Sequence, residues 1–250
     1  MRIHKVIKQN IDKRSEDFVL KNVKGLNLPN AMLIIPDGNG RWAKKMGLSI
    51  SEGHKAGGKT ISQVLDHFMK VDIKVLGIWA FSEDNWKRPH EEINKVMEVI
   101  ENVINENSEK LIENNIRFEV LGKKERIKKE YPSLYKTIEI VTNKTLKSNT
   151  KTLVLFIDYG EKYQLEEFAN KREGDKSTGT YDLLSKINSG LPLFDMVLRT
   201  SGEHRLSGFG PLASLAEFVS VKNNLPELND LDIINALREF SKRQRRFGGR

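Results

Sequence analysis

The sequence predicts a single α/β domain with a central, mainly parallel β-sheet flanked by helices. Short apolar runs rich in β-branched residues recur along the chain, at 31–36, 75–81, 116–122, 152–160 and 195–200. Longer segments with apolar residues three and four positions apart separate them, as at Ile93, Val96, Met97 and Ile100. Short buried strands that alternate with helices are typical of a parallel sheet with helices on both faces.

The domain organisation follows from the same pattern. We expect a helical lead-in over residues 1–29 and one main domain over 30–250, with two small domains as the alternative. The periodicity predicts helices over 54–69 and 93–112 and a last helix from Asp230, which ends in the basic segment KRQRRFGGR. The polar stretch 169–182 reads as a mobile loop or short linker.

Composition limits the chemistry. The chain has no cysteine, which excludes disulfides and thiolate metal sites, so any metal must be a hard cation held by oxygen ligands. No apolar run approaches the roughly 18 residues of a membrane span, and we expect a soluble cytoplasmic protein. The net charge of +8 indicates an anionic partner: nucleic acid, an anionic membrane surface or a phosphorylated small molecule.

The segment LIIPDGNGRWAKK, residues 33–45, joins an apolar run to helical structure through two glycine turns. Glycines at such a junction expose backbone N–H groups near a helix start, a geometry that binds anions. Asp37 offers a carboxylate to a hard cation, and Arg41 offers a guanidinium to phosphate oxygens. A hairpin turn is the alternative interpretation of this segment.

Three polar clusters follow predicted strands and therefore meet at one edge of a parallel sheet. They are Asp37 to Arg41, Ser82 to Arg88, and Arg199 to Ser207. Arg199, Arg205 and Ser207 form a second predicted anion site, although surface salt bridges with Glu203 would also explain these arginines. Together the two anion sites predict two phosphorylated ligands around one metal ion.

Four blocks of sequence carry a family resemblance. DGNGRWAKKMG with GHKAG, WAFSEDNWKRP, VLRTSGEHRLSGF and the closing RRFGG occur in order between about residue 30 and the end. They resemble the signature blocks of the cis-prenyltransferases, the undecaprenyl diphosphate synthase family. The resemblance implies an Mg²⁺-dependent condensation of isopentenyl diphosphate with an allylic diphosphate, with a cis double bond formed at each step.

The resemblance also implies roles for individual residues. Asp37 would hold Mg²⁺, and Glu217 resembles the second carboxylate near the metal, contributed in the family across a homodimer interface. The allylic diphosphate would be bound by Gly38, Asn39, Gly40, Arg41, Trp42 and His54. Isopentenyl diphosphate would be bound by Arg199, Arg205 and Ser207. Ser82, Asn85, Trp86 and Arg88 match a flexible loop that closes over the substrates, with Asn85 a candidate in proton removal.

An apolar tunnel must hold the growing hydrocarbon, and helices over 93–112 and 61–68 are its predicted walls. Ordinary core packing would explain the same apolar spacing.

The chain departs from the family pattern at three places. Ile50 stands where the family usually has an arginine, so one diphosphate contact is missing, and Lys44, Lys45 or Lys55 would have to compensate. DYGEK, residues 158–162, replaces Asn-Tyr-Gly-Gly-Arg. The stretch GFGPLASLAEFV, before and around Glu217, looks one residue shorter than the family's aromatic-rich segment.

These departures keep a second class of function open, a weakly active or non-catalytic subunit of a heteromeric cis-prenyltransferase. A third class, a basic nucleic-acid-binding protein, lacks a recognition helix or an aromatic-interleaved basic strand in the sequence. We therefore expect an enzyme that binds two diphosphates, with peripheral association at a membrane surface and no nucleic acid partner.

Overall fold

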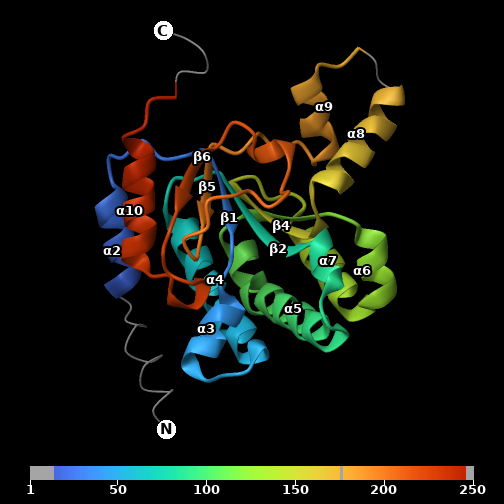
Figure 1. Cartoon of the computed structure of the whole chain (residues 1–250). Helices are drawn as coiled ribbons and strands as arrows, with labels where there is room; N and C mark the ends of the chain where they lie inside the picture. The colour runs from blue at the N-terminus through green and yellow to red at the C-terminus, as the bar shows by residue number, and fades with distance from the viewer. Residues whose placement is uncertain (1–13, 175–176, 246–250) are drawn as a thin grey trace.

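One parallel sheet organises the computed structural model, which describes residues 14–174 and 177–245. Within these residues six strands run in the order β3-β4-β2-β1-β5-β6 (Figure 1). They are β1 (Ala31–Ile35), β2 (Val75–Ser82), β3 (Ile116–Leu121), β4 (Lys151–Tyr159), β5 (Met196–Arg199) and β6 (Glu217–Ser220). All neighbouring pairs are parallel, so every carboxyl end lies at one edge of the sheet. The predicted fold class and the five predicted strands are confirmed.

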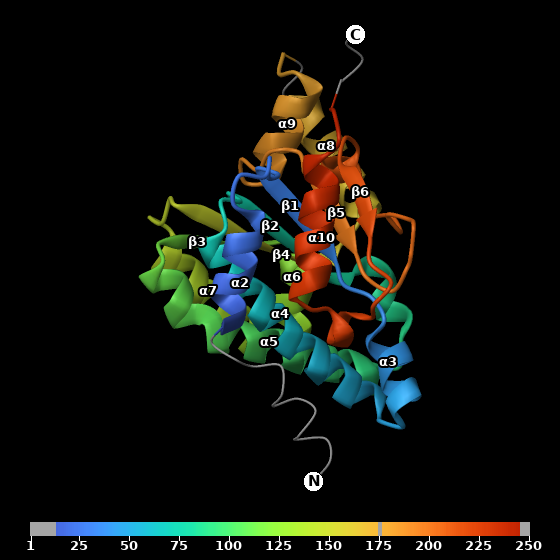
Figure 2. The same cartoon turned by 90° about the vertical axis from the view of Figure 1, so that its left-hand side faces the viewer.

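Helices cover one face of the sheet (Figure 2). They are α2 (Arg14–Val23), α4 (Ile50–Lys70), α5 (His90–Glu113), α7 (Pro132–Thr145) and α10 (Asp230–Ser241). Their apolar sides pack with Ile34, Ile78 and Leu198 in one core, because alternate residues of each strand face these helices. Helix α2, part of the predicted lead-in, lies beside α10 and buries Val19 and Val23 in this core.

The opposite face is covered differently from the prediction of helices on both faces. Two largely irregular segments on either side of β5, residues 191–195 and 200–213, pack Phe194 and Phe209 against Leu33, Phe156 and neighbouring strand residues. The Phe209 ring centroid lies 4.9 Å from that of Phe156, in an edge-to-face arrangement. Large aromatic side chains from a loop thus fill the space that a helix would occupy, and α8 adds only the half-buried Tyr163.

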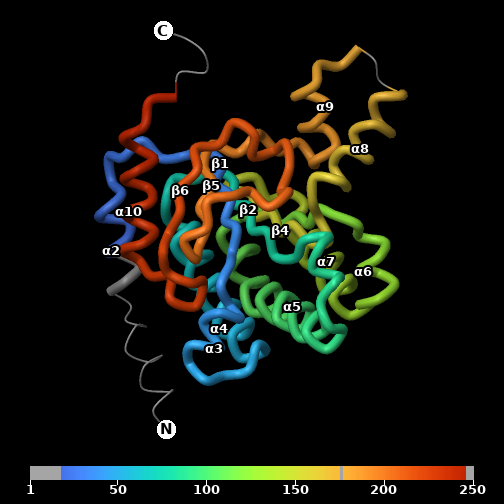
Figure 3. The backbone as a smooth tube through the Cα atoms, viewed as in Figure 1, coloured from blue at the N-terminus to red at the C-terminus, as the bar shows by residue number. Residues whose placement is uncertain are grey.

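The prediction of a loop over 169–182 is wrong for most of its length. Helix α8 (Glu161–Gly174) covers residues 169–174 of the predicted loop, and α9 (Thr180–Ile187) covers residues 180–182. Figure 3 shows this pair standing out from the body of the fold. The helices escaped prediction because they bury few residues, chiefly Gln164 in α8 and Leu183 and Leu184 in α9.

The ends of the chain partly match expectation. The last helix begins at Asp230 as predicted. The basic segment after it packs onto the fold: Arg243 Nη1 lies 2.9 Å from Glu217 Oε2, and Arg245 pairs with Asp195. The rest of the predicted lead-in, residues 1–13, and the final residues 246–250 lie outside the described part of the chain. Among the described helices, none combines the length and the apolar character needed to cross a membrane.

Candidate active site

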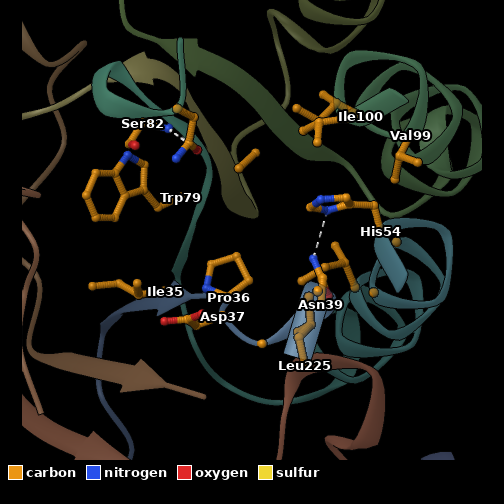
Figure 4. Close-up of a pocket in the computed structure, with 18 of the residues that line it drawn as sticks. Ile35, Pro36, Asp37, Asn39, His54, Trp79, Ser82, Val99, Ile100 and Leu225 are labelled. Atoms are coloured by element: carbon orange, nitrogen blue, oxygen red, sulfur yellow. Dashed lines mark hydrogen bonds between the residues drawn. The ribbon is translucent and has the colours of Figure 1, made fainter. Parts of the chain in front are cut away.

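A cavity of about 630 Å³ opens at the carboxyl ends of β1, β2 and β5 (Figure 4). Asp37 enters it two residues after β1, Ser82 ends β2, and Arg199 ends β5. The three clusters that the sequence predicted at one edge of the sheet therefore do converge. The polar rim continues into an apolar wall between α4 and α5, so the cavity has two chemically distinct halves.

Asp37 lies between two guanidinium groups. Its Oδ1 is 2.9 Å from Arg41 Nη2, and its Oδ2 is 3.1 Å from Arg199 Nη2. The Asp37 backbone N–H donates to Thr200 Oγ1 at 2.7 Å, which fixes the start of the turn to the end of β5. One carboxylate thus faces two guanidinium groups, the type of donor that binds anionic ligands.

Arg199 holds the third cluster together. It is buried, and its Nη1 donates to Ser207 Oγ at 2.8 Å and to the backbone carbonyl of Arg205. The Arg205 side chain points elsewhere and pairs with Glu203, whose other oxygen is 2.7 Å from Arg41 Nη1. Glu203 therefore bridges the arginines of the two predicted anion sites, as the salt-bridge alternative anticipated, while Arg199 and Ser207 still line the cavity.

The turn after Asp37 depends on glycine, because its backbone lies close to Ser201. Gly38 has φ of 95°, and a Cβ there would lie 2.0 Å from Ser201 Oγ, so only glycine fits. Gly38 also caps α3 (Asn39–Met46), and no side chain caps the first N–H groups of that helix. Gly38, Asn39, Gly40 and Arg41 all line the cavity, which leaves these N–H groups facing the rim, where helix starts attract anions.

Asn39 and His54 connect α3 to α4. Asn39 Nδ2 lies 3.2 Å from His54 Nδ1, a contact drawn as a dashed line in Figure 4. The close approach depends on Gly57, where a Cβ would lie 2.3 Å from Asn39 Oδ1. Because the amide donates to Nδ1, the neutral ring carries its proton on Nε2, which is buried 3.5 Å from Glu92 Oε1. Burial, aided by the charge of Arg88, lowers the pKa of His54 below its ordinary value.

The segment after β2 forms another wall. Its short helix η1 (Glu83–Lys87) begins with a hydrogen bond of 3.0 Å from the Ser82 N–H to Asn85 Oδ1. Arg88 Nη1 donates to Glu92 Oε1 at 3.1 Å, and Ser82, Asn85, Arg88 and Glu92 all line the cavity. This segment is held by hydrogen bonds along its length, although the family resemblance implied a flexible loop.

The apolar wall lies between α4 and α5. Ile61 comes from α4, and the side chains from α5 are Val96, Val99, Ile100 and Val103. Gly58 lets these helices approach, since a Cβ there would lie 2.8 Å from Val99 Cγ1. The predicted tunnel walls thus do line the cavity in part, while Val64 and Phe68 belong to the core instead.

Four predicted site residues do not line this cavity: Trp42, Trp86, Arg205 and Glu217. Trp42 is half-buried on α3, and Trp86 turns toward Asp158, where its Nε1 donates at 2.8 Å. Glu217 starts β6 opposite Met196, the first residue of β5, whereas Arg199 ends that strand. Three residues of extended strand separate Glu217 from the carboxyl-end rim by about 10 Å.

The donor set for a metal is small. No group of three or more His, Asp or Glu side chains within residues 14–174 and 177–245 is arranged to hold a metal ion. Asp37 is the carboxylate on the rim beside the α3 start, and the Asn39 Oδ1 near it is buried without a hydrogen-bond partner. This set fits a Mg²⁺ ion that keeps water and phosphate oxygens as its other ligands, and it does not fit a metal held by protein alone.

Ile50 occupies the mouth of the cavity with 49% of its surface exposed. None of the three proposed substitutes for the missing arginine lines the cavity: Lys44 and Lys45 end α3, and Lys55 lies on α4. Lys45 instead lies 2.9 Å from Glu227 Oε1. Within residues 14–174 and 177–245, none of these lysines supplies a cation to the rim beside Ile50.

Three further residues were not anticipated from the sequence. Glu92 lines the cavity four residues after Arg88, a helical spacing that could have revealed it. Thr200 anchors Asp37 directly after Arg199, and Trp79 lines the cavity from β2 with its Nε1 bonded to the Tyr159 carbonyl at 3.0 Å. No sequence signal distinguishes these last two from ordinary strand residues.

Comparison with known proteins agrees with this geometry. Residues 35–248 match the family model described as "Putative undecaprenyl diphosphate synthase". This chain belongs to the undecaprenyl diphosphate synthase family of prenyltransferases. An isoprenyl transferase of Fusobacterium nucleatum is 33% identical over 226 residues, covering 89% of this chain and 97% of the relative. An isoprenyl transferase of Clostridium perfringens is 34% identical over 246 residues, with 94% of both chains covered.

Solved structures of this family share the fold. A "probable undecaprenyl diphosphate synthase" of Campylobacter jejuni superposes with a TM-score of 0.72 at 26% identity, covering 89% of this chain and all of that one. Lavandulyl diphosphate synthase of Lavandula x intermedia, solved in complex with dimethylallyl diphosphate, gives a TM-score of 0.81 at 24% identity, covering 88% of this chain and 98% of that one. At that identity the second likeness establishes the fold alone.

Proposed function

We propose that this prenyltransferase family member is an Mg²⁺-dependent cis-prenyltransferase that condenses isopentenyl diphosphate with an allylic prenyl diphosphate. The main support is that one cavity joins a polar rim, where Arg41 and Arg199 pair with Asp37, to an apolar wall between α4 and α5. A prenyl diphosphate has the same two halves, a highly charged head and a hydrocarbon tail. The product is a polyprenyl diphosphate with Z double bonds.

The allylic diphosphate binds at the start of α3. The N–H groups of this helix start, together with the Arg41 guanidinium, bind its phosphate oxygens. His54 is neutral because burial lowers its pKa. Its Nε2–H, 3.5 Å from Glu92 Oε1, is the proposed donor to a further phosphate oxygen. Isopentenyl diphosphate binds at the end of β5, where Arg199 and Ser207 lie 2.8 Å apart.

Asp37 is the proposed ligand for Mg²⁺, with the phosphate oxygens of the substrate completing the coordination. When bound, Mg²⁺ would neutralise charge on the diphosphate and so make it a better leaving group. Without a ligand, Arg41 and Arg199 share the Asp37 carboxylate. A diphosphate competes for both guanidinium groups, which frees the carboxylate for the cation and couples metal binding to substrate binding.

The reaction breaks the allylic C–O bond, and diphosphate leaves with the electron pair. The double bond of isopentenyl diphosphate attacks the allylic carbon, and the newly added unit loses a proton, which the departing diphosphate can accept. Asn85 faces the cavity beside Ser82 and is the proposed positioning group for that proton removal. Arg88, which donates to Glu92, adds a third guanidinium to the polar rim.

The assembly and location are also proposals. A homodimer would bring the partner's copy of Glu217 toward the metal, since within one chain Glu217 begins β6 at the far end of that strand. The net charge of +8 suits peripheral binding to an anionic membrane surface, where a long hydrocarbon product would be released.

A turnover assay tests the function. Purified protein, Mg²⁺, labelled isopentenyl diphosphate and allylic diphosphates of increasing length should give a ladder of labelled products that EDTA abolishes. Asp37→Ala should lower turnover by a factor of about 100 or more, whereas Asp72→Ala, at an exposed carboxylate far from the cavity, should not. A folded protein that makes no product from any starter would instead support the non-catalytic subunit, favoured by Ile50 at the mouth.

A further inference from the structure

Asp158 is a buried carboxylate that the proposed reaction does not use. Its side chain is 0% exposed, and its backbone has φ of 52°, a left-handed conformation that Asn and Asp tolerate better than most residues. In the strand register, Phe81 pairs with Ile157 and Ser82 pairs with Tyr159. Asp158 is therefore an extra residue of β4 with no partner on β2, a bulge that turns its side chain toward the segment after β2.

The carboxylate of Asp158 holds a tryptophan of that segment. Its Oδ1 accepts a hydrogen bond of 2.8 Å from Trp86 Nε1, and its Oδ2 lies 3.2 Å from Arg126 Nε. The Arg126 guanidinium also covers the Trp86 ring at 5.0 Å from the centroid. Asp158 thus holds the edge of the indole and Arg126 covers one of its faces, and these two side chains also contact each other.

Two aromatic side chains also pack against the Trp86 indole. The Phe81 ring meets the Trp86 ring edge-to-face at 5.3 Å, and the Tyr131 ring lies at 6.2 Å. Burial raises the pKa of Asp158 above its ordinary value, while the Trp86 hydrogen bond and the charges of Arg126 and Lys123 act against that rise and Glu83 adds to it. A buried carboxylate without such partners would be costly, so the three side chains depend on one another.

Trp86 lies beside the residues that face the cavity. Asn85 and Arg88 are on either side of it and both line the cavity, while Trp86 itself does not. The anchoring of its indole fixes the backbone between these two side chains, whose own ends are held by the Ser82 N–H and by Glu92. We propose that Asp158 and Arg126 form a clamp that, through Trp86, positions Asn85 and Arg88 for the reaction. This proposal rests on the proposed function for its catalytic consequence, but the clamp itself is a property of the fold.

Three variants test the clamp. Trp86→Phe keeps an aromatic ring and removes the Nε1–H donor, and Arg126→Met keeps the apolar stem and removes the charge. Asp158→Asn keeps a carbonyl oxygen for the indole N–H. We expect Trp86→Phe and Arg126→Met to increase amide hydrogen exchange in residues 82–88 by a factor of about ten and to lower kcat by a similar factor, about 1.4 kcal/mol in barrier. Asp158→Asn should retain most of both properties.

Arg117→Met is the matched control, because Arg117 also pairs with a buried carboxylate, that of Glu119 on β3, away from the cavity. It should lower stability without changing hydrogen exchange in 82–88 or kcat. The proposal is overturned when Trp86→Phe and Arg126→Met leave hydrogen exchange and kcat within twofold of the wild type, or when Arg117→Met has the same effect on both. If the wild type makes no product, the proposed function fails, and hydrogen exchange alone still decides whether the clamp exists.

Discussion

Arg199 Nη2 lies 3.1 Å from Asp37 Oδ2, so an ion pair joins the end of β5 to the turn after β1 across 162 positions of the sequence. The same guanidinium donates to Ser207 Oγ and to the Arg205 carbonyl. A single buried side chain therefore fixes the distance between the two predicted anion sites. Its fork of donors serves three acceptors at once, which a lysine ammonium cannot do in the same geometry.

We expect Arg199→Lys to raise the Kd for isopentenyl diphosphate by a factor of ten or more, because charge-assisted hydrogen bonds contribute about 1.5–3 kcal/mol each. Arg205→Lys should have a smaller effect, since that side chain is exposed and pairs with Glu203. Calorimetric titration of both variants would measure the difference. Equal losses would mean that Arg199 has no special place in binding.

Ile50→Arg should strengthen binding of the allylic diphosphate. The side chain lines the cavity mouth and is half exposed, so a guanidinium fits there without burial, and none of Lys44, Lys45 or Lys55 lines the cavity. A new charged contact of about 1.5 kcal/mol corresponds to a Kd about tenfold lower. Ile50→Gln supplies a neutral donor as the control, and an unchanged Kd for the arginine variant would contradict the expectation.

The pKa of His54 predicts a pH dependence of stability. Because burial lowers this pKa in the folded protein, the unfolded chain binds more protons once the pH falls below about 6.5, and the free energy of unfolding then decreases. Urea unfolding between pH 7.5 and 5.5 should therefore show a smaller loss of stability in His54→Gln than in the wild type. His90→Gln, at an exposed histidine, should follow the wild-type curve.

The cavity wall predicts how product length responds to mutation. Gly58→Ala places a methyl group against Val99 Cγ1, which narrows the space between α4 and α5 and should shift products toward shorter chains. Val103→Ala removes bulk from the same wall and should shift them toward longer chains. Chromatographic sizing of extracted products would test both, and shifts in the same direction would show that this wall does not limit chain length.

The sequence predicted those parts of the fold whose signal is local. Five strands appear as apolar runs, and glycine turns mark the start of α3. Strand β6 was not predicted because Glu217–Ser220 has only two apolar residues, Phe218 and Val219, and follows a segment rich in glycine, proline and alanine. Helices α8 and α9 were hidden because they bury few side chains.

For the site, the parallel direction of the predicted strands sufficed to bring Asp37, Ser82 and Arg199 to one edge of the sheet. The sequence could not reveal which way a side chain turns within a cluster. Arg205 turns to Glu203, which lies only two residues away. Trp86 turns to Asp158 of β4, and that pair depends on tertiary packing, which periodicity does not encode.

The strand order also has a consequence for synthesis of the chain. Strand β1 lies between β2 and β5, and β5 begins only at Met196. Until then, a nascent sheet of β3, β4, β2 and β1 leaves the apolar strand Ala31–Ile35 at an unprotected edge, ready to pair with another chain. Truncation before Met196 should therefore yield aggregates in place of a soluble fragment. The last fifth of the chain is needed both to cover the open edge of β1 and to complete the ion pair at Asp37.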